Sequence, residues 1–407
     1  MKFIKDPVHG FVQVPVEEEG LLDSMPVQRL RHIRQLGFAY LVYPGANHSR
    51  FEHALGTMHL ASIACTSFGL DGTESRAVAA AALLHDCGHG PFSHATEPLM
   101  KEYLDRGHED ISALLDVEEI GRALLRAGVE EGTLISILEG RDPLSGIIHG
   151  ELDVDRMDYL LRDAHYTGVP YGTVDPHRLI QSSHLTDGGI VLDEGGVNAA
   201  ESLLIARTLM RPAVYLHHVS RIASSMLSLA IMDECRQAQE GLRKRLESLM
   251  AMDDAALMYT LLHSESQISS SLAAMLYRRH LYKRALYVGP DQVDTTRLQR
   301  EGESFEKSRR IAAAIALEAG VAETQVLVDI PRMPPDLSLP ILVRNRHDAV
   351  PLEDISPLVD TLNRTRRAQW RAGVYTLPEI RDRVSQAAME VLRVKRLTKQ
   401  DRLSVGA

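Results

Sequence analysis

The chain has 407 residues, of which 44% are hydrophobic and 25% are charged, values typical of a soluble globular protein. This length exceeds what one core usually needs, so we expect two packed regions or one domain with a large extension. The net charge of −10 argues against a broad nucleic-acid-binding surface, and no apolar run reaches the roughly 18 residues of a membrane span. Three widely spaced cysteines and an N-terminus without signal-peptide features predict a cytoplasmic protein.

Hydrophobic periodicity predicts a mostly helical first part, from about residue 20 to residue 280. Apolar residues recur at helical intervals over residues 21–37, where Gly37 is a stop signal. Further helices are expected at residues 52–68, 74–86, 154–164 and 197–239. The second of these contains AVAAAALLHD, which is nearly all apolar and should be buried on most sides. In the last, Pro212 predicts a kink or a break.

Strand signals are few before residue 280, where GGIVLD (188–193) predicts one strand of a hairpin. Beyond it, the segments RALYVG, TQVLVDI, LPILVR and AGVYTL alternate with helical patterns at 302–319 and 377–395. The predicted fold class is therefore mainly α, with a helical region over residues 1–280 and a smaller α+β region over residues 281–407. No motif indicates a role for the second region.

The segment LLHDCGHGPFSH (83–94) combines three histidines with an aspartate. His85 and Asp86 point about 100° apart on a helix, yet both reach one cation if other elements complete the site. His53 and Asp155 are the candidates for completing it, because two imidazoles and two carboxylates suit a divalent transition metal. Asp86 follows a nearly continuous apolar segment, so its buried negative charge needs compensation by a cation or by hydrogen bonds. The alternative is a polar helix end, with His53 on the surface.

The same segment predicts a turn and an acid–base pair. Three helix-breaking residues follow the His–Asp pair, namely Gly88, Gly90 and Pro91. They would end the helix and carry His89 and His94 back over the same cleft. Glu97 lies three residues after His94, so on a helix the two share a face. A carboxylate beside an imidazole orients the ring and favours its charged form, which suits a general acid. The alternative for each histidine is a polar contact near the core.

In its order of His53, His85–Asp86 and Asp155, the chain resembles the HD-domain phosphohydrolases. The strings NHSRFEHALG, HDCGHGPFSH and LDVDRMDYLLRDA are similar to the deoxynucleoside triphosphate triphosphohydrolase branch, which includes the sterile-alpha-motif and HD-domain enzyme of animal cells. The likeness extends over roughly residues 4–220, without a preceding sterile-alpha-motif segment. It implies a helical HD-domain core, with its metal site at about residues 48–165, and one divalent cation. Mn, Fe, Zn, Co, Ni and Mg are not distinguished by such a ligand set.

The resemblance also implies roles for other residues. It places His89 and His108 beside the phosphates, and it makes His94, oriented by Glu97, the acid for the leaving 5′ oxygen. Substrate contacts are implied for Gln35, Arg50, Arg156, Tyr159, Asp163, Arg207 and Tyr215. In this set the arginines would clamp phosphates, Gln35 and Asp163 would contact the 3′-hydroxyl, and the tyrosines would exclude ribose. The alternatives are an i,i+3 ion pair for Arg156 and plain core packing for the tyrosines.

A regulatory site is implied at the start of the chain. Asp23, Gln28 and Arg31 match the pattern that binds an activating guanine nucleotide between subunits in the animal enzyme. If that site is real, the protein should assemble as a homodimer or homotetramer. The alternative is an ordinary amphipathic helix with a polar face.

Taken together, the resemblance implies a metal-dependent enzyme that converts a dNTP and water to a deoxynucleoside and tripolyphosphate, with GTP or a dNTP as a candidate activator. One alternative is the same metal site acting on another phosphate ester, such as a nucleoside monophosphate, a cyclic nucleotide or an oxidised nucleotide. The other alternative is a nucleotide sensor or single-strand nucleic-acid binder whose metal site is structural. The intact set of His53, His85, Asp86 and Asp155 favours an enzyme.

Overall fold

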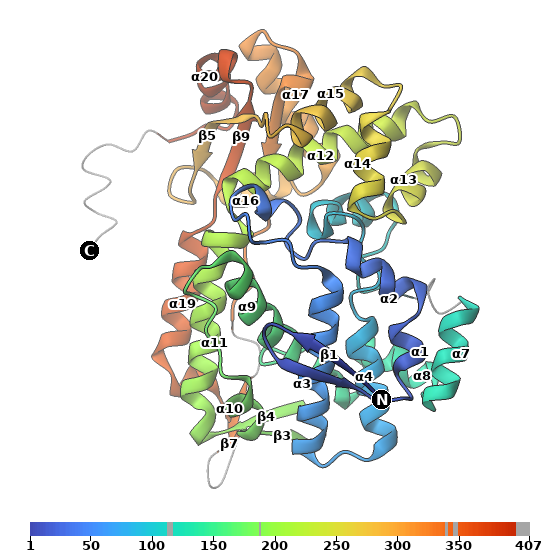
Figure 1. The fold of residues 1–407 in the computed structure, drawn as a ribbon. Coiled ribbons are helices and arrows are strands. Elements are labelled where there is room, and N and C mark those ends of the chain that lie inside the picture. The colour runs from blue at the N-terminus through green and yellow to red at the C-terminus, as the bar shows by residue number, and fades with distance from the viewer. Residues whose placement is uncertain (112–116, 187–188, 338–340, 345–348, 396–407) are drawn as a thin grey trace.

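The computed structural model describes residues 1–111, 117–186, 189–337, 341–344 and 349–395 (Figure 1). It is mainly helical, with a smaller α+β part formed late in the chain, and the predicted fold class is thereby confirmed. Within the described residues, no helix has both the length and the apolar character that crossing a membrane would require.

The chain opens with an antiparallel hairpin followed by short helical turns. In order these are β1 (Lys2–Asp6), β2 (Gly10–Val14), α1 (Glu19–Leu22), α2 (Met25–Arg29), η1 (Leu30–His32) and η2 (Gly37–Leu41). The single helix predicted over residues 21–37 is therefore wrong. Ser24 is extended, with a ψ of 147°, and Pro26 starts a new helix at α2 because its missing N–H is no loss there. A second extended residue, Ile33, ends η1.

Two long antiparallel helices form the centre of the molecule. They are α3 (Arg50–Phe68) and α4 (Gly72–Leu84), and they match the predicted helices at 52–68 and 74–86. Gly69 ends α3 with a φ of 71°, and the Asp71 side chain caps α4 by accepting from two backbone N–H groups. Residues 77–84 of α4 are all buried, as the apolar pattern predicted.

Further helices follow along the chain. They are η3 (Ser93–Ala95), α5 (Glu97–Tyr103), α7 (Glu118–Ala127), α8 (Glu131–Leu138), η4 (Pro143–Ile147), α9 (Val154–Thr167), α10 (Pro176–Gln181), η5 (Glu194–Gly196), α11 (Val197–Met210), η6 (Arg211–Tyr215) and α12 (His218–Gln237). α9 packs against α3 and carries the predicted amphipathic segment. The break predicted at Pro212 is confirmed, because η6 is a π-helical turn between α11 and α12.

The rest of the chain contributes helices and the strands of two sheets. These elements are α13 (Leu242–Met250), α14 (Asp254–Leu262), α15 (Gln267–Tyr277), β5 (Lys283–Val288), α16 (Thr295–Glu301), α17 (Phe305–Ala319), η7 (Glu323–Gln325), β6 (Val326–Asp329), β7 (Leu342–Arg344), β8 (Ala349–Pro351), α18 (Leu352–Ile355), α19 (Pro357–Ala368), β9 (Ala372–Thr376), η8 (Pro378–Ile380) and α20 (Arg381–Val391). β9 lies between β5 and β6, antiparallel to both, and α17 and α20 pack on this sheet.

The second sheet joins distant parts of the sequence. The predicted hairpin is formed by β3 (Ser183–Thr186) and β4 (Gly189–Asp193), although residue 188 lies outside the described residues. β7 then pairs in parallel with β4, so a strand from the C-terminal third completes a sheet begun before residue 200. The division of the chain at residue 280 stays a prediction, and this parallel pair links its two parts.

Candidate active site

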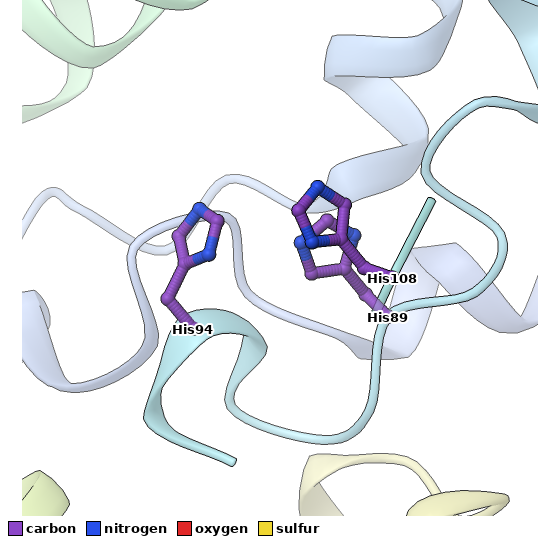
Figure 2. A group of neighbouring side chains, drawn as sticks. All are labelled: His89, His94 and His108. Carbon is purple, nitrogen blue, oxygen red and sulfur yellow. The ribbon is translucent and has the colours of Figure 1, made fainter. Parts of the chain in front are cut away.

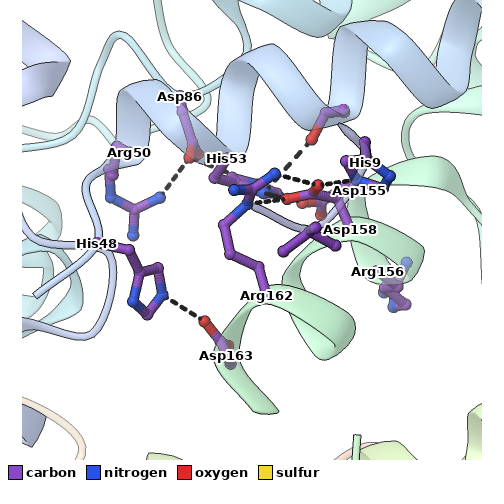
Figure 3. Close-up of polar contacts among 12 residues, drawn as sticks. His9, His48, Arg50, His53, Asp86, Asp155, Arg156, Asp158, Arg162 and Asp163 are labelled. Carbon is purple, nitrogen blue, oxygen red and sulfur yellow. Dashed lines mark hydrogen bonds and ion pairs between the residues drawn. The ribbon is translucent and has the colours of Figure 1, made fainter. Parts of the chain in front are cut away.

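The four predicted metal ligands lie together where three helices meet, and Figure 3 shows three of them, His53, Asp86 and Asp155. His53 comes from α3, His85 and Asp86 follow the last residue of α4, and Asp155 lies in the first turn of α9. Asp155 Oδ1 is 2.9 Å from His53 Nε2 and 3.7 Å from His85 Nε2. Asp86 lies 3.7 Å from His53 Nε2 and 3.5 Å from His85 Nε2. The adjacent His and Asp thus reach one centre, as the sequence predicted.

The chemistry of this group fits a divalent cation. The Nδ1 atom of His85 donates to the Ala82 carbonyl oxygen at 2.7 Å, which leaves Nε2 as a lone pair facing the carboxylates. That Nε2 atom is buried and has no hydrogen-bond partner among the described residues. For His53, burial lowers the pKa, but hydrogen bonds to Asp155 and Asp158 outweigh it and raise the pKa to about 10. The group thus favours positive charge at its centre, as a metal site does.

Behind His53 lies a charged layer that the sequence analysis missed. Asp158, on α9, accepts from His53 Nδ1 at 2.8 Å, from His9 Nε2 at 2.6 Å and from two nitrogens of Arg162 at 2.9 Å (Figure 3). Arg162 also donates to Asp6 at 2.7 Å. Burial raises the pKa of Asp158, but Arg162 and the histidines hold it well below its ordinary value. The carboxylate therefore stays ionised and fixes which nitrogen of His53 faces the centre.

A sequence signal for this layer existed. Asp158 lies three residues after Asp155 and four before Arg162, so all three share one side of α9. His9 and Asp6 belong to the stretch DPVHG, which lies within the residues 4–220 that carry the family likeness, and the sequence analysis assigned neither of them a role. The contact of His9 with Asp158 and that of Asp6 with Arg162 tie the N-terminal hairpin to the metal centre.

Three more histidines gather beside the centre, and two of them share one carboxylate. Figure 2 shows the stacked rings of His89 and His108, whose centroids are 4.0 Å apart, with His94 facing them. Glu97 accepts from His94 Nδ1 at 2.7 Å through one oxygen and from His108 Nδ1 at 2.9 Å through the other. Lys101 also pairs with Glu97, at 2.5 Å. The predicted His94–Glu97 contact is present, and Glu97 orients His108 as well, which the sequence did not indicate.

The three histidines and the four predicted metal ligands line a cavity of about 230 Å³. Its walls are formed by Gln35, Arg50, His53, His85, Asp86, His89, His94, His108, Glu109, Leu138, His149, Asp155 and Tyr159. The sequence analysis did not select His149 or Glu109 for this wall. Desolvation lowers the pKa of His149 to about 4, so its ring is neutral at neutral pH. No spacing signal marks His149, because it follows η4 outside the matched strings.

Arg50 is the one predicted phosphate clamp on the cavity wall. Its Nη1 donates to Asp86 at 2.6 Å and its Nε donates to Ser93 Oγ at 2.7 Å. Its Nη2 is buried without a partner among the described residues. Gln35 shares this property, since its Oε1 is also buried and unpaired within the described part of the chain. Both side chains thus keep hydrogen-bonding capacity for a ligand.

Arg156 and Arg207 are arranged differently. Arg207 pairs with Glu151 at 2.5 Å, and Arg156 lies 3.8 Å from the same carboxylate. Arg156 also pairs with Asp153, which is the i,i+3 contact that the sequence analysis kept as an alternative. Neither arginine is among the residues that line the cavity.

Three of the four predicted sugar contacts, Tyr159, Tyr215 and Asp163, form a chain that leads away from the cavity. Tyr159 lines the cavity, and its ring lies edge-on to that of Tyr215, with centroids 6.0 Å apart. The Tyr215 hydroxyl donates to Asp163 at 2.8 Å, and His48 contacts the other oxygen of Asp163 at 2.8 Å. Asp163 is 1% exposed, so both of its oxygens are committed to internal partners.

The three residues of the predicted regulatory site lie on and beside α2. Gln28 donates to the Leu22 carbonyl oxygen at 2.8 Å and accepts from Arg31 at 2.8 Å. The Arg31 guanidinium lies 3.5 Å from the centroid of the Phe51 ring, and exposed Asp23 pairs with Lys2. Gln28 and Arg31 thus contact each other, whereas Asp23 faces the N-terminal strand.

Comparisons with known proteins identify the family of this chain. Residues 50–163 match the family model of the HD domain, and residues 174–403 match that of the HD associated region. An uncharacterized protein of Methanocaldococcus jannaschii is 31% identical, over 96% of this chain and 84% of the relative. Deoxynucleoside triphosphate triphosphohydrolase SAMHD1 of Gallus gallus is 29% identical, over 72% of this chain and 57% of the relative.

Among solved structures, a phosphohydrolase from Bacteroides thetaiotaomicron is 26% identical and superposes with a TM-score of 0.71. The match covers 92% of this chain and 99% of that one. The HD-domain match begins at Arg50 and ends at Asp163, so it contains all four predicted metal ligands. The chain belongs to the HD-domain phosphohydrolase family.

Proposed function

We propose that this protein is a dNTP triphosphohydrolase that converts a dNTP and water to a deoxynucleoside and tripolyphosphate. The observation that carries the proposal is the position of His94, which lines the same cavity as His53, His85, Asp86 and Asp155 and is held by Glu97. A relative named as a deoxynucleoside triphosphate triphosphohydrolase, 29% identical to this chain, supports the choice of substrate.

One divalent cation held by His53, His85, Asp86 and Asp155 would supply a Lewis acid that activates water and neutralises phosphate charge. Asp158 keeps the His53 ring in the orientation that such a cation needs. Arg50, with one unpaired guanidinium nitrogen, donates to a phosphate oxygen beside the centre. These contacts hold the α-phosphate in place.

His94 acts as the acid for the 5′ oxygen of the leaving deoxynucleoside. Glu97 accepts from its Nδ1, so Nε2 is the nitrogen that faces the substrate and transfers the proton. His89 and His108 bind phosphate oxygens from the same wall, and Glu97 fixes the His108 ring as it fixes His94. Because one carboxylate holds both rings, the distance and orientation between the acid, His94, and the phosphate-binding His108 are fixed.

The remaining substrate contacts are proposals of the same kind. Gln35 and Tyr159 on the cavity wall would contact the sugar, and Tyr215 and Asp163 would support Tyr159 from behind. Arg156 and Arg207 would reach a phosphate once Glu151 releases them. Activation by GTP or a dNTP at Asp23, Gln28 and Arg31, assembly as a homodimer or homotetramer, and a cytoplasmic location are part of the same proposal.

Product analysis tests the proposal. The purified protein, loaded with Mn²⁺, is incubated with each of the four dNTPs and four NTPs, with and without GTP. The proposal predicts deoxynucleoside and tripolyphosphate from dNTPs, and a requirement for GTP would support the regulatory site. Release of phosphate or pyrophosphate would favour action on another phosphate ester, and absence of turnover with metal bound would favour a sensor.

A further inference from the structure

A buried arginine in α19 has no partner that accounts for it. Arg366 is 3% exposed, and its Nε and Nη1 atoms have no hydrogen-bond partner among the described residues. Guanidinium nitrogens can only donate, and a buried cation without acceptors is costly. A ligand with acceptor atoms would lower the free-energy cost of burying this guanidinium.

Two further arginines share its surroundings. α19 packs against α11, which carries Arg207 in its last turn, and Arg211 follows at the start of η6. Burial lowers the pKa of Arg366 to about 10, with the positive charges of Arg207 and Arg211 as the next causes. Among the described residues, Arg207 has an ion pair, with Glu151 at 2.5 Å, whereas Arg211 and Arg366 have none. Of the three arginines, one is in a direct ion pair with a carboxylate, and Glu151 and Asp336 act on Arg366 only as more distant negative charges.

The arginine cluster adjoins the cavity. Tyr159 is on the cavity wall, and its hydroxyl is an electrostatic neighbour of both Arg207 and Arg211. Arg207 keeps 18% of its side chain exposed, so the cluster is open on that side. Arg366 contributes to it from the α+β part of the chain, for which the sequence indicated no role.

We propose that Arg207, Arg211 and Arg366 form a subsite that binds a phosphate group. Phosphate oxygens offer several acceptors to planar guanidinium forks and supply the negative charge that the cluster lacks. The phosphate can belong to the substrate or to a separate anion, and the chemistry of recognition is the same. The binding claim stands apart from the proposed triphosphohydrolase activity, whereas the assignment to a substrate phosphate rests on it.

The test compares Arg366→Gln with Arg364→Gln in the full chain. Arg364 lies on the same helix, is 69% exposed and pairs with Asp360 one turn away, so its loss removes a charge outside the cluster. Binding of inorganic tripolyphosphate is measured by calorimetry. Loss of charged hydrogen bonds predicts affinity about 10- to 100-fold weaker for Arg366→Gln and unchanged for Arg364→Gln.

Thermal unfolding gives a readout that a merely structural arginine would not produce. In phosphate-free buffer Arg366→Gln should unfold at or above the wild-type Tm, because it removes a repelled cation. With tripolyphosphate present its Tm should rise less than that of the wild type. If Arg366→Gln does not fold, Arg211→Gln, at a part-exposed position, is expected to weaken tripolyphosphate binding in the same way.

Kinetics separate the two sources of the phosphate. A raised KM for dNTP with kcat nearly unchanged assigns the subsite to the substrate, and weaker tripolyphosphate binding with an unchanged KM assigns it to a separate anion. If dNTP is not turned over, the proposed function fails while the binding result still decides on the subsite. Tripolyphosphate affinity equal in Arg366→Gln, Arg364→Gln and the wild type would overturn the proposal.

Discussion

Replacing Asp158 with Asn tests whether the charged layer behind His53 controls metal binding. Asn has the same shape but no charge, so the His53 Nδ1 atom and Arg162 lose a carboxylate partner in a region that is at most 1% exposed. Removing such a partner of a metal-ligating histidine typically lowers metal affinity about 10- to 100-fold. That range corresponds to about 1.4 to 2.7 kcal/mol of binding free energy.

The same change also has a cost in stability. Arg162 would retain Asp6, at 2.7 Å, as its one remaining ionised partner among the described residues. Removing one partner of a buried ion pair typically lowers the free energy of unfolding by about 3 to 5 kcal/mol. Because Arg162 keeps its pair with Asp6, the expected loss for Asp158→Asn lies near the lower limit of that range. A lower Tm is therefore expected together with weaker metal binding, and circular dichroism at the assay temperature confirms that the variant is folded.

The assay titrates Mn²⁺ into metal-free protein in competition with a fluorescent chelator. Asp163→Asn is the matched control, since Asp163 is also a buried carboxylate on α9 that contacts a histidine, His48, away from the metal centre. It should retain wild-type Mn²⁺ affinity. Wild-type affinity in Asp158→Asn, or an equal loss in both variants, would refute the orienting role of Asp158.

Three further predictions concern the centre and the acid pair. Replacing His85 and Asp86 together with Ala should abolish bound metal and turnover, as measured by metal analysis and product formation, and retained metal would show that the ligands lie elsewhere. Glu97→Ala should lower kcat about 100-fold with metal content unchanged, since it frees the rings of His94 and His108; full activity would reject the pair. Burial raises the pKa of Glu97, but hydrogen bonds from both histidines hold that pKa well below 4.5. Ionised Glu97 therefore stabilises the fold above pH 4.5, and this stabilisation is lost as the pH falls and the carboxylate is protonated. The Tm difference between wild type and Glu97→Gln should therefore shrink below about pH 4.5, and a constant difference would contradict the lowered pKa.

The helices around the metal centre could be predicted because their signals are local. An apolar run ending in His85 and Asp86 indicated both a buried helix and a polar end, and the structure shows both. The helix over residues 21–37 was predicted wrongly because its apolar spacing masked two extended residues, Ser24 and Ile33. Periodicity alone does not show where a chain leaves the helical conformation.

Contacts between distant segments were the part that the sequence could not indicate. Glu151 holds Arg207 from 56 positions away, so a residue matched as a phosphate contact is turned toward a carboxylate. β7 joins β4 across about 150 residues of chain, and no turn signal marks a parallel pair of this kind. Arg366 lies in α19, a helix that the sequence analysis did not predict, and its burial depends on that helix.

One reaction tests the central claim most directly. The Mn²⁺-loaded protein is incubated with a dNTP in ¹⁸O-labelled water, and the products are separated and weighed by mass spectrometry. Attack of water on the α-phosphorus, with His94 protonating the 5′ oxygen, predicts unlabelled deoxynucleoside and tripolyphosphate that carries one solvent oxygen. Label in the deoxynucleoside, or pyrophosphate or phosphate as the product, would contradict the proposed reaction.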